Sequence, residues 1–116
     1  MNPRNLFKNA DNLEHFAAGT TVFHKGDPGD YMYVVMEGEV DVMADGNYIR
    51  TLNPGDIFGE MSLIDDAPRS ADTVARADCI LAPVDERRFL FLVHETPMFA
   101  LHMLGVMARR LRDWQK

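Results

Sequence analysis

The chain has 116 residues, of which 47% are hydrophobic and 26% charged, so it suffices for one compact domain and has the composition of a globular protein rather than a disordered one. Its formal net charge of −6 argues against a nucleic-acid-binding surface, because neutralising a phosphate backbone needs an extended basic patch. The single cysteine, Cys79, excludes an internal disulfide framework and a cysteine-ligated iron–sulfur cluster, and we expect it to be a buried structural thiol.

In the N-terminal segment, residues 1–18, the first ten residues contain no continuous apolar run. They mix Asn, Arg and Lys with isolated apolar residues, which predicts neither a signal peptide nor a membrane span. We therefore expect a protein that stays in the cytoplasm. Apolar residues at Leu6, Phe7, Leu13 and Phe16 indicate a short helical segment within this stretch.

Residues 19–84 are predicted to form strands. Short β-branched or aromatic runs alternate there with glycine turns, a pattern typical of antiparallel strands in a sandwich or roll. The runs 31–36 and 39–44 are followed by Asp45-Gly46 and then by the run 47–52. An Asp-Gly pair between extended runs is a strong signal for a β-hairpin.

Two turns of similar sequence interrupt the predicted strands. Residues 27–30 are Asp-Pro-Gly-Asp, and residues 53–56 are Asn-Pro-Gly-Asp. In such a turn proline fixes φ near about −65°, and glycine occupies the position with positive φ. We therefore predict a positive φ at Gly29 and at Gly55, at corners of a rolled sheet.

The C-terminal residues 85–116 are predicted to be helical. Asp85 can cap a first helix, and Thr96-Pro97 supplies a cap and a first-turn proline for a second helix that runs to the chain end. The apolar residues expected to face inward from the first helix are Phe89, Leu90, Leu92 and Val93. The second helix has an apolar stripe, expected against the roll or a partner, formed by Leu104, Met107, Leu111 and Trp114. We expect one domain over residues 1–116.

The stretch from Ile57 to Ala71 carries the main functional signal. Gly59 leads into a short apolar turn, and Arg69 follows a proline-marked loop. Glycine lets the backbone approach a ligand closely, and N–H groups at the start of a helical turn attract anions. Arg69 would add a planar fork that matches two phosphate oxygens, and Ser70 offers a hydroxyl and an N–H beside it. Together these residues predict a phosphate site.

Glu60 stands beside this predicted anion site and cannot hold a phosphate. Its carboxylate suits a neighbouring hydroxyl, such as the ribose 2′-OH, which is the one free ribose hydroxyl of a 3′,5′-cyclic nucleotide. The alternative is that Glu60 and Arg69 form a solvated ion pair worth less than about 1 kcal/mol. Spacing alone does not decide between these two interpretations.

The motif Phe58-Gly59-Glu60-Met61-Ser62-Leu63, followed by Pro68-Arg69-Ser70-Ala71, resembles the phosphate-binding cassette of the cyclic nucleotide-binding domains. That family includes protein kinase A regulatory subunits, nucleotide-gated channels and the bacterial catabolite activator protein. The resemblance extends from about Phe16 to Arg112. It implies a mainly β fold, an eight-stranded antiparallel β-roll (a double-stranded β-helix of jelly-roll type) with flanking N- and C-terminal α-helices.

The resemblance also implies the ligand and its site. A cyclic nucleotide would lie inside the roll, with Glu60 on the ribose hydroxyl and Arg69 on the phosphate. Ser70 stands where family members selective for cGMP tend to carry threonine, which favours cAMP over cGMP. The expected ligand-binding residues are Phe58, Gly59, Glu60, Met61, Ser62, Arg69, Ser70, Ala71 and Trp114.

Trp114 is included because family members commonly close the base side of the pocket with a residue of the C-terminal helix or of a neighbouring chain. As the only tryptophan, it could stack on the adenine, or it could simply pack on the apolar stripe. The C-terminal helix is the expected moving part, and its movement would signal to an effector protein or to a second copy of the chain.

The sequence departs from the family in two ways. Asp72 stands where a small or hydroxyl residue is usual, and a carboxylate pointing inward there would weaken the phosphate site. In a strand Asp72 should face opposite to Ala71 and Thr73, so we expect it to be exposed to solvent. The helix-turn-helix segment of the catabolite activator family is missing, so we expect no direct gene regulation by this chain alone.

Two other functions compete with a cyclic-nucleotide receptor. Metal-binding cupins share a β-roll and the Pro-Gly-Asp turn, but the four histidines here are scattered and form no His-x-His pair, so we expect no metal, no cofactor and no enzymatic activity. The other possibility is a degenerate roll that serves only oligomerisation or partner docking. The presence of Gly59, Glu60, Arg69 and Ser70 argues against this second possibility.

Overall fold

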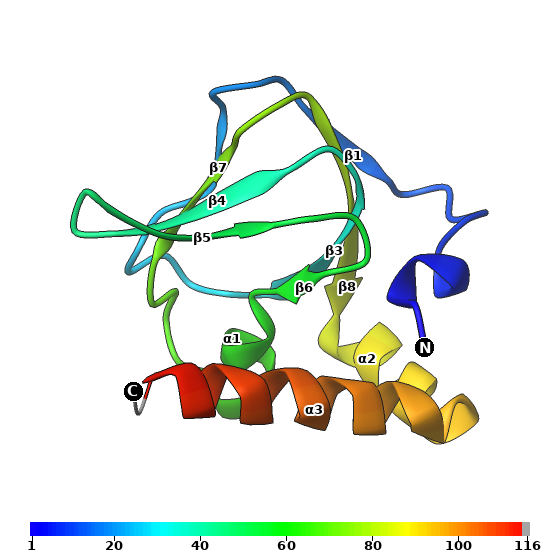
Figure 1. Ribbon diagram of the computed structural model, residues 1–116. Coiled ribbons are helices and arrows are strands. Elements are labelled where there is room, and N and C mark those ends of the chain that lie inside the picture. The colour runs from blue at the N-terminus through cyan, green and yellow to red at the C-terminus, as the bar shows by residue number, and fades with distance from the viewer. Residues whose placement is uncertain (115–116) are drawn as a thin grey trace. The chain divides into compact units, whose positions relative to one another are not determined.

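Two four-stranded antiparallel sheets form the β part of the chain in the computed structural model, which describes residues 1–114 and their side chains as far as Arg112 (Figure 1). The strand orders are β1-β8-β3-β6 and β2-β7-β4-β5. The strands are β1 (Glu14–Phe16), β2 (Thr21–Phe23), β3 (Tyr31–Glu37), β4 (Val40–Ala44), β5 (Asn47–Leu52), β6 (Ile57–Phe58), β7 (Asp72–Ala75) and β8 (Cys79–Asp85). This arrangement confirms the predicted mainly β fold of eight antiparallel strands among the described residues.

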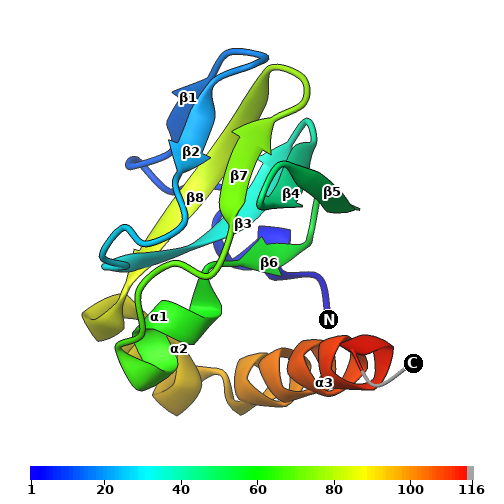
Figure 2. The same cartoon turned by 90° about the vertical axis from the view of Figure 1, so that its left-hand side faces the viewer.

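Four helices accompany the strands in the described part of the chain. They are the 3₁₀ helix η1 (Pro3–Leu6) and the α-helices α1 (Glu60–Asp65), α2 (Glu86–Glu95) and α3 (Pro97–Trp114). The chain divides into two compact units, of which one comprises residues 2–86 and the other begins at Arg87. The first unit holds all the described strands together with η1 and α1, and α1 follows β6 directly (Figure 2).

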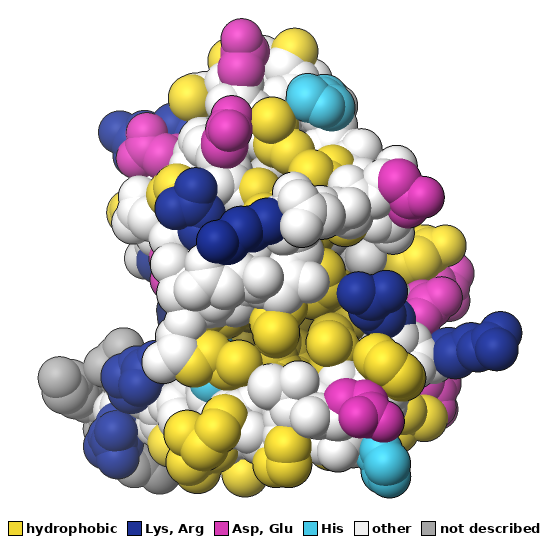
Figure 3. Space-filling view, turned by 90° about the vertical axis from the view of Figure 1, so that its right-hand side faces the viewer, with side chains coloured by type: hydrophobic (Ala, Val, Ile, Leu, Met, Phe, Trp, Pro, Cys, Tyr) yellow, Lys and Arg dark blue, Asp and Glu magenta, His cyan; other side chains and the backbone are white. Residues whose placement is uncertain are grey.

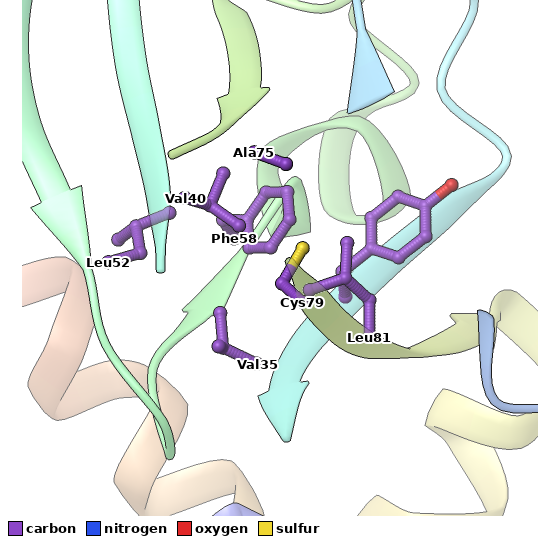
Figure 4. Packing of buried hydrophobic residues seen from close by; sticks show 8 residues of the cluster. Val35, Val40, Leu52, Phe58, Ala75, Cys79 and Leu81 are labelled. Atoms are coloured by element: carbon purple, nitrogen blue, oxygen red, sulfur yellow. The ribbon is translucent and has the colours of Figure 1, made fainter. Parts of the chain in front are cut away.

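The core of the β unit lies between its two sheets. β3 is buried along its middle five residues because it is flanked by β8 and β6 in its sheet and covered on both faces. Figure 4 shows the side chains that meet in the core. The buried cluster consists of Tyr33, Val35, Val40, Leu52, Phe58, Ala75, Cys79 and Leu81, and Phe16, Val22, Phe23 and Val42 pack against it.

The predicted hairpin is confirmed, and its turn has the expected geometry. β4 pairs with β5, and Ala44 lies opposite Asn47. The two residues between them, Asp45 and Gly46, have φ values of 52° and 81°. Positive φ at both central positions matches the right-handed twist of the flanking strands, which is why Asp-Gly is favoured there.

The predicted helical segment over residues 1–18 is wrong beyond its first few residues. The short helix η1 ends at Leu6; Pro3 occupies its first turn, and the Asn2 side chain accepts a hydrogen bond from the Arg4 N–H. β1 then pairs with β8, so the roll begins at Glu14 rather than at residue 19. The apolar residues between Leu6 and Phe16 therefore belong to two different elements and not to one helix. The segment 14–16 forms a strand because it pairs with the edge of β8.

The two predicted Pro-Gly turns differ. Gly55 has the expected positive φ, of 96°, but Gly29 lies outside the left-handed region, so that prediction is wrong for Gly29. Gly29 is required for space instead, since an added Cβ would overlap with Ser62. The sequence pattern of a turn specifies local backbone conformation but cannot reveal a neighbour from elsewhere in the chain.

The helical unit confirms the predicted helix start at Pro97. The Phe99 N–H donates to the carbonyl of Thr96 at 2.8 Å, and the rings of Phe89 and Phe99 meet edge to face at a centroid distance of 5.9 Å. Leu92 is buried, as predicted, whereas Leu90 is 58% exposed. Leu90 lies about 160° around the helix from the buried Leu92, so the two face opposite sides of the helix.

The predicted apolar stripe of α3 is only partly covered. Leu104 and Leu111 are exposed, and the buried residues of this helix, as far as Arg112, are Phe99 and Met103. Figure 3 shows exposed hydrophobic side chains in yellow. No single helix among residues 1–114 has the length and apolar character needed to cross a membrane, although α2 and α3, bent by 114° at their junction, together reach that length and composition.

Cys79 gives a direct test of the core. It is a free thiol, 3% exposed, and burial, followed by the nearby charge of Asp78, raises its pKa. Both effects suppress the reactive thiolate. We predict that a chromogenic disulfide reagent at pH 8 modifies the native protein at least about 100-fold more slowly than the urea-unfolded chain. Equal rates in the two states would contradict the buried position of this thiol.

Candidate functional site

Gly59 forms the sharp turn between β6 and α1. Its backbone is left-handed, with φ 77° and ψ 8°, and it occupies the position immediately before the first residue of α1. A Cβ on this residue would lie 2.6 Å from Nη1 of Arg69 and 3.3 Å from the carbonyl oxygen of Tyr31. Glycine is therefore needed for conformation and also for the close approach of Arg69.

Arg69 is the central charged residue of the site. The residue is 5% exposed, and its side chain donates from Nη1 to the Gly59 carbonyl at 3.0 Å and from Nη2 to the Tyr31 carbonyl at 2.6 Å. Its Nε has no hydrogen-bond partner among the described residues, and the ion pairs found there do not include Arg69. The guanidinium is thus held by neutral groups.

Burial dominates the electrostatics of Arg69. It lowers the pKa of the guanidinium, and the nearby groups Tyr33, Asp30, Asp27 and Glu60 offset only part of this effect. An arginine still stays protonated at neutral pH. The site therefore contains a cation that has lost most of its water, which makes it a strong attractor for an anion.

The turn between β2 and β3 holds the backbone of Arg69. The Gly26 N–H donates to the Arg69 carbonyl, and the Arg69 N–H donates to the Asp27 carbonyl, both at 2.8 Å. The turn is closed by the His24 N–H, which donates to the Asp27 carboxylate at 3.0 Å. Arg69 is therefore fixed at its backbone as well as at its guanidinium.

Asp72 binds the same turn between β2 and β3 that holds the Arg69 backbone. Its carboxylate accepts a hydrogen bond from the Lys25 N–H at 2.7 Å, and the residue is half-buried rather than exposed as predicted. Thr73, the next residue, is 2% exposed, so the two side chains face opposite sides of β7 as expected. Asp72, although unusual at this position, therefore stabilises the turn that holds Arg69.

Glu60 and Ser62 are buried in α1, with exposed fractions of 2% and 3%. Glu60 follows Gly59 directly and raises the pKa of Arg69 through its charge. Ser62 lies against Gly29, and an added Cβ on Gly29 would also come within 3.0 Å of the Arg69 Cζ. These burials do not fit the alternative of a solvated surface pair between Glu60 and Arg69.

The other predicted site residues differ in how far they are buried. Phe58 is 3% exposed and stacks on Tyr33 at a centroid distance of 5.3 Å, and Ala71 is half-buried. Met61 is 50% exposed, and Ser70 is also exposed. Trp114 is the last residue of α3, and its side chain lies outside the described residues.

Sequence reasoning missed three contributors to the site. They are the ring of Phe23, the carbonyl of Tyr31 and the close contact of Gly29. A backbone carbonyl leaves no sequence signal, and Gly29 could have been recognised only as a turn residue. Among residues with described side chains, no group of three His, Cys, Asp or Glu could hold a metal ion.

Comparison with known proteins gives a consistent set of matches. A family model described as "Cyclic nucleotide-binding domain" matches residues 13–96. The "Cyclic AMP receptor protein" of Thermus thermophilus is 37% identical over an alignment of 103 residues, and the match covers 84% of this chain and 48% of that protein. The "cAMP-dependent protein kinase regulatory subunit" of Eremothecium gossypii is 39% identical over 71 residues, 61% of this chain and 16% of that protein. The chain thus spans about half or less of these curated relatives.

A solved structure also resembles the chain over nearly its whole length. It is described as "A cyclic-GMP-dependent signalling pathway regulates bacterial phytopathogenesis" and matches with a TM-score of 0.82 at 28% identity. The match covers 96% of this chain and 92% of that one.

Gly29 provides a test of the packing around Arg69. We predict that Gly29→Ala lowers the free energy of unfolding by about 1–3 kcal/mol through overpacking. In a Ser62→Gly background most of this loss should disappear, because the overlapping atoms of Ser62 are then absent. Gly26→Ala is the matched control: it adds strain at φ 91° but meets nothing within 4 Å, so Ser62→Gly should not relieve it. Urea unfolding measures the loss caused by Gly29→Ala and by Gly26→Ala, each in the parent and in the Ser62→Gly background. If Gly29→Ala costs as much stability in the Ser62→Gly background as in the parent, the contact between Gly29 and Ser62 is contradicted.

Proposed function

The chain belongs to the family of cyclic nucleotide-binding domains, and from this premise we propose that it is a receptor that captures cAMP through Arg69 and Glu60 and performs no chemistry on it. The observation that carries the proposal is the state of Arg69. Its guanidinium is buried, its described partners are neutral, and its Nε–H has no hydrogen-bond partner among the described residues.

The phosphate of a cyclic nucleotide suits this cation. It carries one negative charge and presents two free oxygens, so it can accept hydrogen bonds from an arginine edge while compensating the buried charge. Two of the five N–H groups of Arg69 donate to the Gly59 and Tyr31 carbonyls, which leaves the Nε edge for the anion. α1 has only six residues, so its dipole adds little and Arg69 dominates.

Glu60 suits the sugar of the same ligand. It lies one residue beyond Gly59, whose carbonyl binds Arg69, so its carboxylate belongs to the same corner of the roll. A carboxylate accepts several hydrogen bonds, and a ribose 2′-hydroxyl is a neutral donor of suitable size.

Two observations support cAMP over other cyclic nucleotides. Ser70 in place of threonine favours cAMP, and the two curated relatives described above are named for cAMP. The similar solved structure is instead described by a cyclic-GMP-dependent pathway. The choice between the two purines is therefore part of the test.

The output of the receptor is proposed to pass through the helical unit. Arg69 and Glu60, the proposed phosphate and ribose contacts, lie within residues 2–86, whereas α3 and α2 from Arg87 onward belong to the other unit. A ligand shifts an equilibrium only if it binds one arrangement better than another, so α3 would take different positions with and without cAMP. The exposed Leu104 and Leu111 suit contact with an effector protein or a second copy, and Trp114 is the proposed residue over the base.

Titration calorimetry with cAMP, cGMP and linear 5′-AMP tests the proposal. We predict that cAMP binds most tightly and that AMP, which carries a doubly charged phosphate and a free 3′-hydroxyl, binds at least about tenfold more weakly. Arg69→Ala should weaken cAMP binding by about 30-fold to several-thousand-fold, because truncating a buried charge partner costs about 2–5 kcal/mol. Arg69→Lys should bind cAMP with an affinity between those of the parent and Arg69→Ala, because lysine keeps the charge and loses the planar fork of the guanidinium.

Thermal unfolding of the same Arg69 variants is the control for folding. Since burial lowers the pKa of Arg69 in the folded protein, its charge costs stability at neutral pH, and this cost would fall only as the pH rises through the lowered pKa. Removing the charge therefore need not unfold the protein. A folded Arg69→Ala variant that binds cAMP within a few-fold of the parent would remove Arg69 from the site.

Glu60 is tested with a ligand that lacks the proposed hydroxyl. We predict that 2′-deoxy-cAMP binds the parent about 10- to 150-fold more weakly than cAMP, as expected for a hydrogen bond to a charged group worth about 1.5–3 kcal/mol. The Glu60→Gln variant should bind the two ligands nearly equally. A parent protein that does not distinguish them has no carboxylate on the ribose.

A further inference from the structure

Phe23, the last residue of β2, lies directly against the guanidinium of Arg69. The Cζ atom of Arg69 is 4.1 Å from the centroid of the Phe23 ring. The turn that begins at the next residue, His24, binds the Arg69 backbone through Gly26 and Asp27. One continuous segment therefore contacts both the main chain and the charged end of Arg69.

An irregularity in β2 brings the ring to this position. Thr21 pairs with Val74 and Phe23 pairs with Thr73, so two steps along β2 match one step along β7. Without the extra residue, Thr21 and Phe23 would face the same side of the sheet. The bulge instead sets Phe23 opposite Thr73, which is 2% exposed, on the inner side of the sheet.

Other aromatic rings brace Phe23 in place. Its centroid is 6.3 Å from that of Tyr33 and 5.9 Å from that of Phe58, and the latter two rings stack on each other. Phe23 cannot turn away without disturbing both neighbours. The guanidinium thus rests on a fixed aromatic surface.

The chemistry of this contact suits an anion site. An aromatic face attracts a cation through its quadrupole and carries no charge of its own. A carboxylate in the same position would hold Arg69 equally well but would neutralise it. A ring supports the guanidinium and leaves its charge for the ligand.

We propose that Phe23 is a positioning residue, which holds the guanidinium of Arg69 in the orientation that binds the anionic group of the ligand; this inference rests on the proposed function. Phe23 acts through Arg69 and is not required to touch the nucleotide. Its contribution should appear in the affinity for any ligand whose anion Arg69 binds.

The first measurement needs no ligand. A proton above an aromatic ring is shifted upfield, so the Nε–H resonance of Arg69, identified by its loss in Arg69→Lys, should lie upfield in the parent and in Phe23→Tyr. In Phe23→Leu and Phe23→Met it should return to the ordinary arginine range. Phe16→Leu is the matched control, because Phe16 also packs against the core cluster as a partly buried phenylalanine.

The second measurement is the dissociation constant for cAMP. Phe23→Leu and Phe23→Met should weaken binding about tenfold, the size expected for a partly desolvated cation–π contact, and Phe23→Tyr should stay within about threefold of the parent. Phe16→Leu should also stay within about threefold, although thermal unfolding should show a loss of stability similar to that of Phe23→Leu. Two ring-less substitutions keep the test available if one of them does not fold.

The outcomes separate the two proposals. If the upfield shift is lost in Phe23→Leu while cAMP affinity is unchanged, the positioning role is wrong and the proposed function stands. If Phe16→Leu weakens binding as much as Phe23→Leu, the effect is general packing, and the positioning role is again overturned. A parent protein that binds no nucleotide overturns the proposed function, and the role of Phe23 in it.

Discussion

A buried cation attracts an anion only if the protein holds it without neutralising it. Arg69 meets this condition, since carbonyl oxygens of Gly59 and Tyr31 hold its far end and an aromatic ring supports its face. A carboxylate in contact would remove the reason to bind a ligand, and full exposure would allow water and salt to screen the charge. The adjacency of β3 and β6 meets this need, because it brings the carbonyls of Tyr31 and Gly59 within reach of one side chain.

Much of the fold could be predicted because its signals are local. Asp45-Gly46 specifies a hairpin through the φ values of two adjacent residues, and Thr96-Pro97 marks a helix start through the proline of its first turn. The cassette is also a local feature: Gly59 and Arg69 are ten residues apart, and the structure joins them by a hydrogen bond. Within α1 the sequence could not show that Glu60 and Ser62 are buried while Met61 is exposed, because that depends on what the short helix packs against.

The remaining features depend on contacts between distant segments. β1 is a strand because β8 pairs with it, and Gly29 is a glycine because Ser62 lies against it. Phe23 faces inward because of a bulge that depends on the register with β7. Hydrophobic periodicity and turn residues describe a segment by itself, so such contacts remain invisible until the whole fold is known.

The Arg69 contacts also have a consequence for folding. The hydrogen bond from Arg69 to Tyr31 joins residues 38 positions apart, and the turn at Gly26 is further still from Arg69 in the sequence. Long-range contacts of this kind close large loops and form slowly, so the proposed anion site is complete only when β7 has joined its sheet. A ligand that binds only the completed site stabilises the entire β unit by mass action. The concentration of the ligand would therefore set how much of the newly made protein survives proteolysis, in addition to how much of it is occupied.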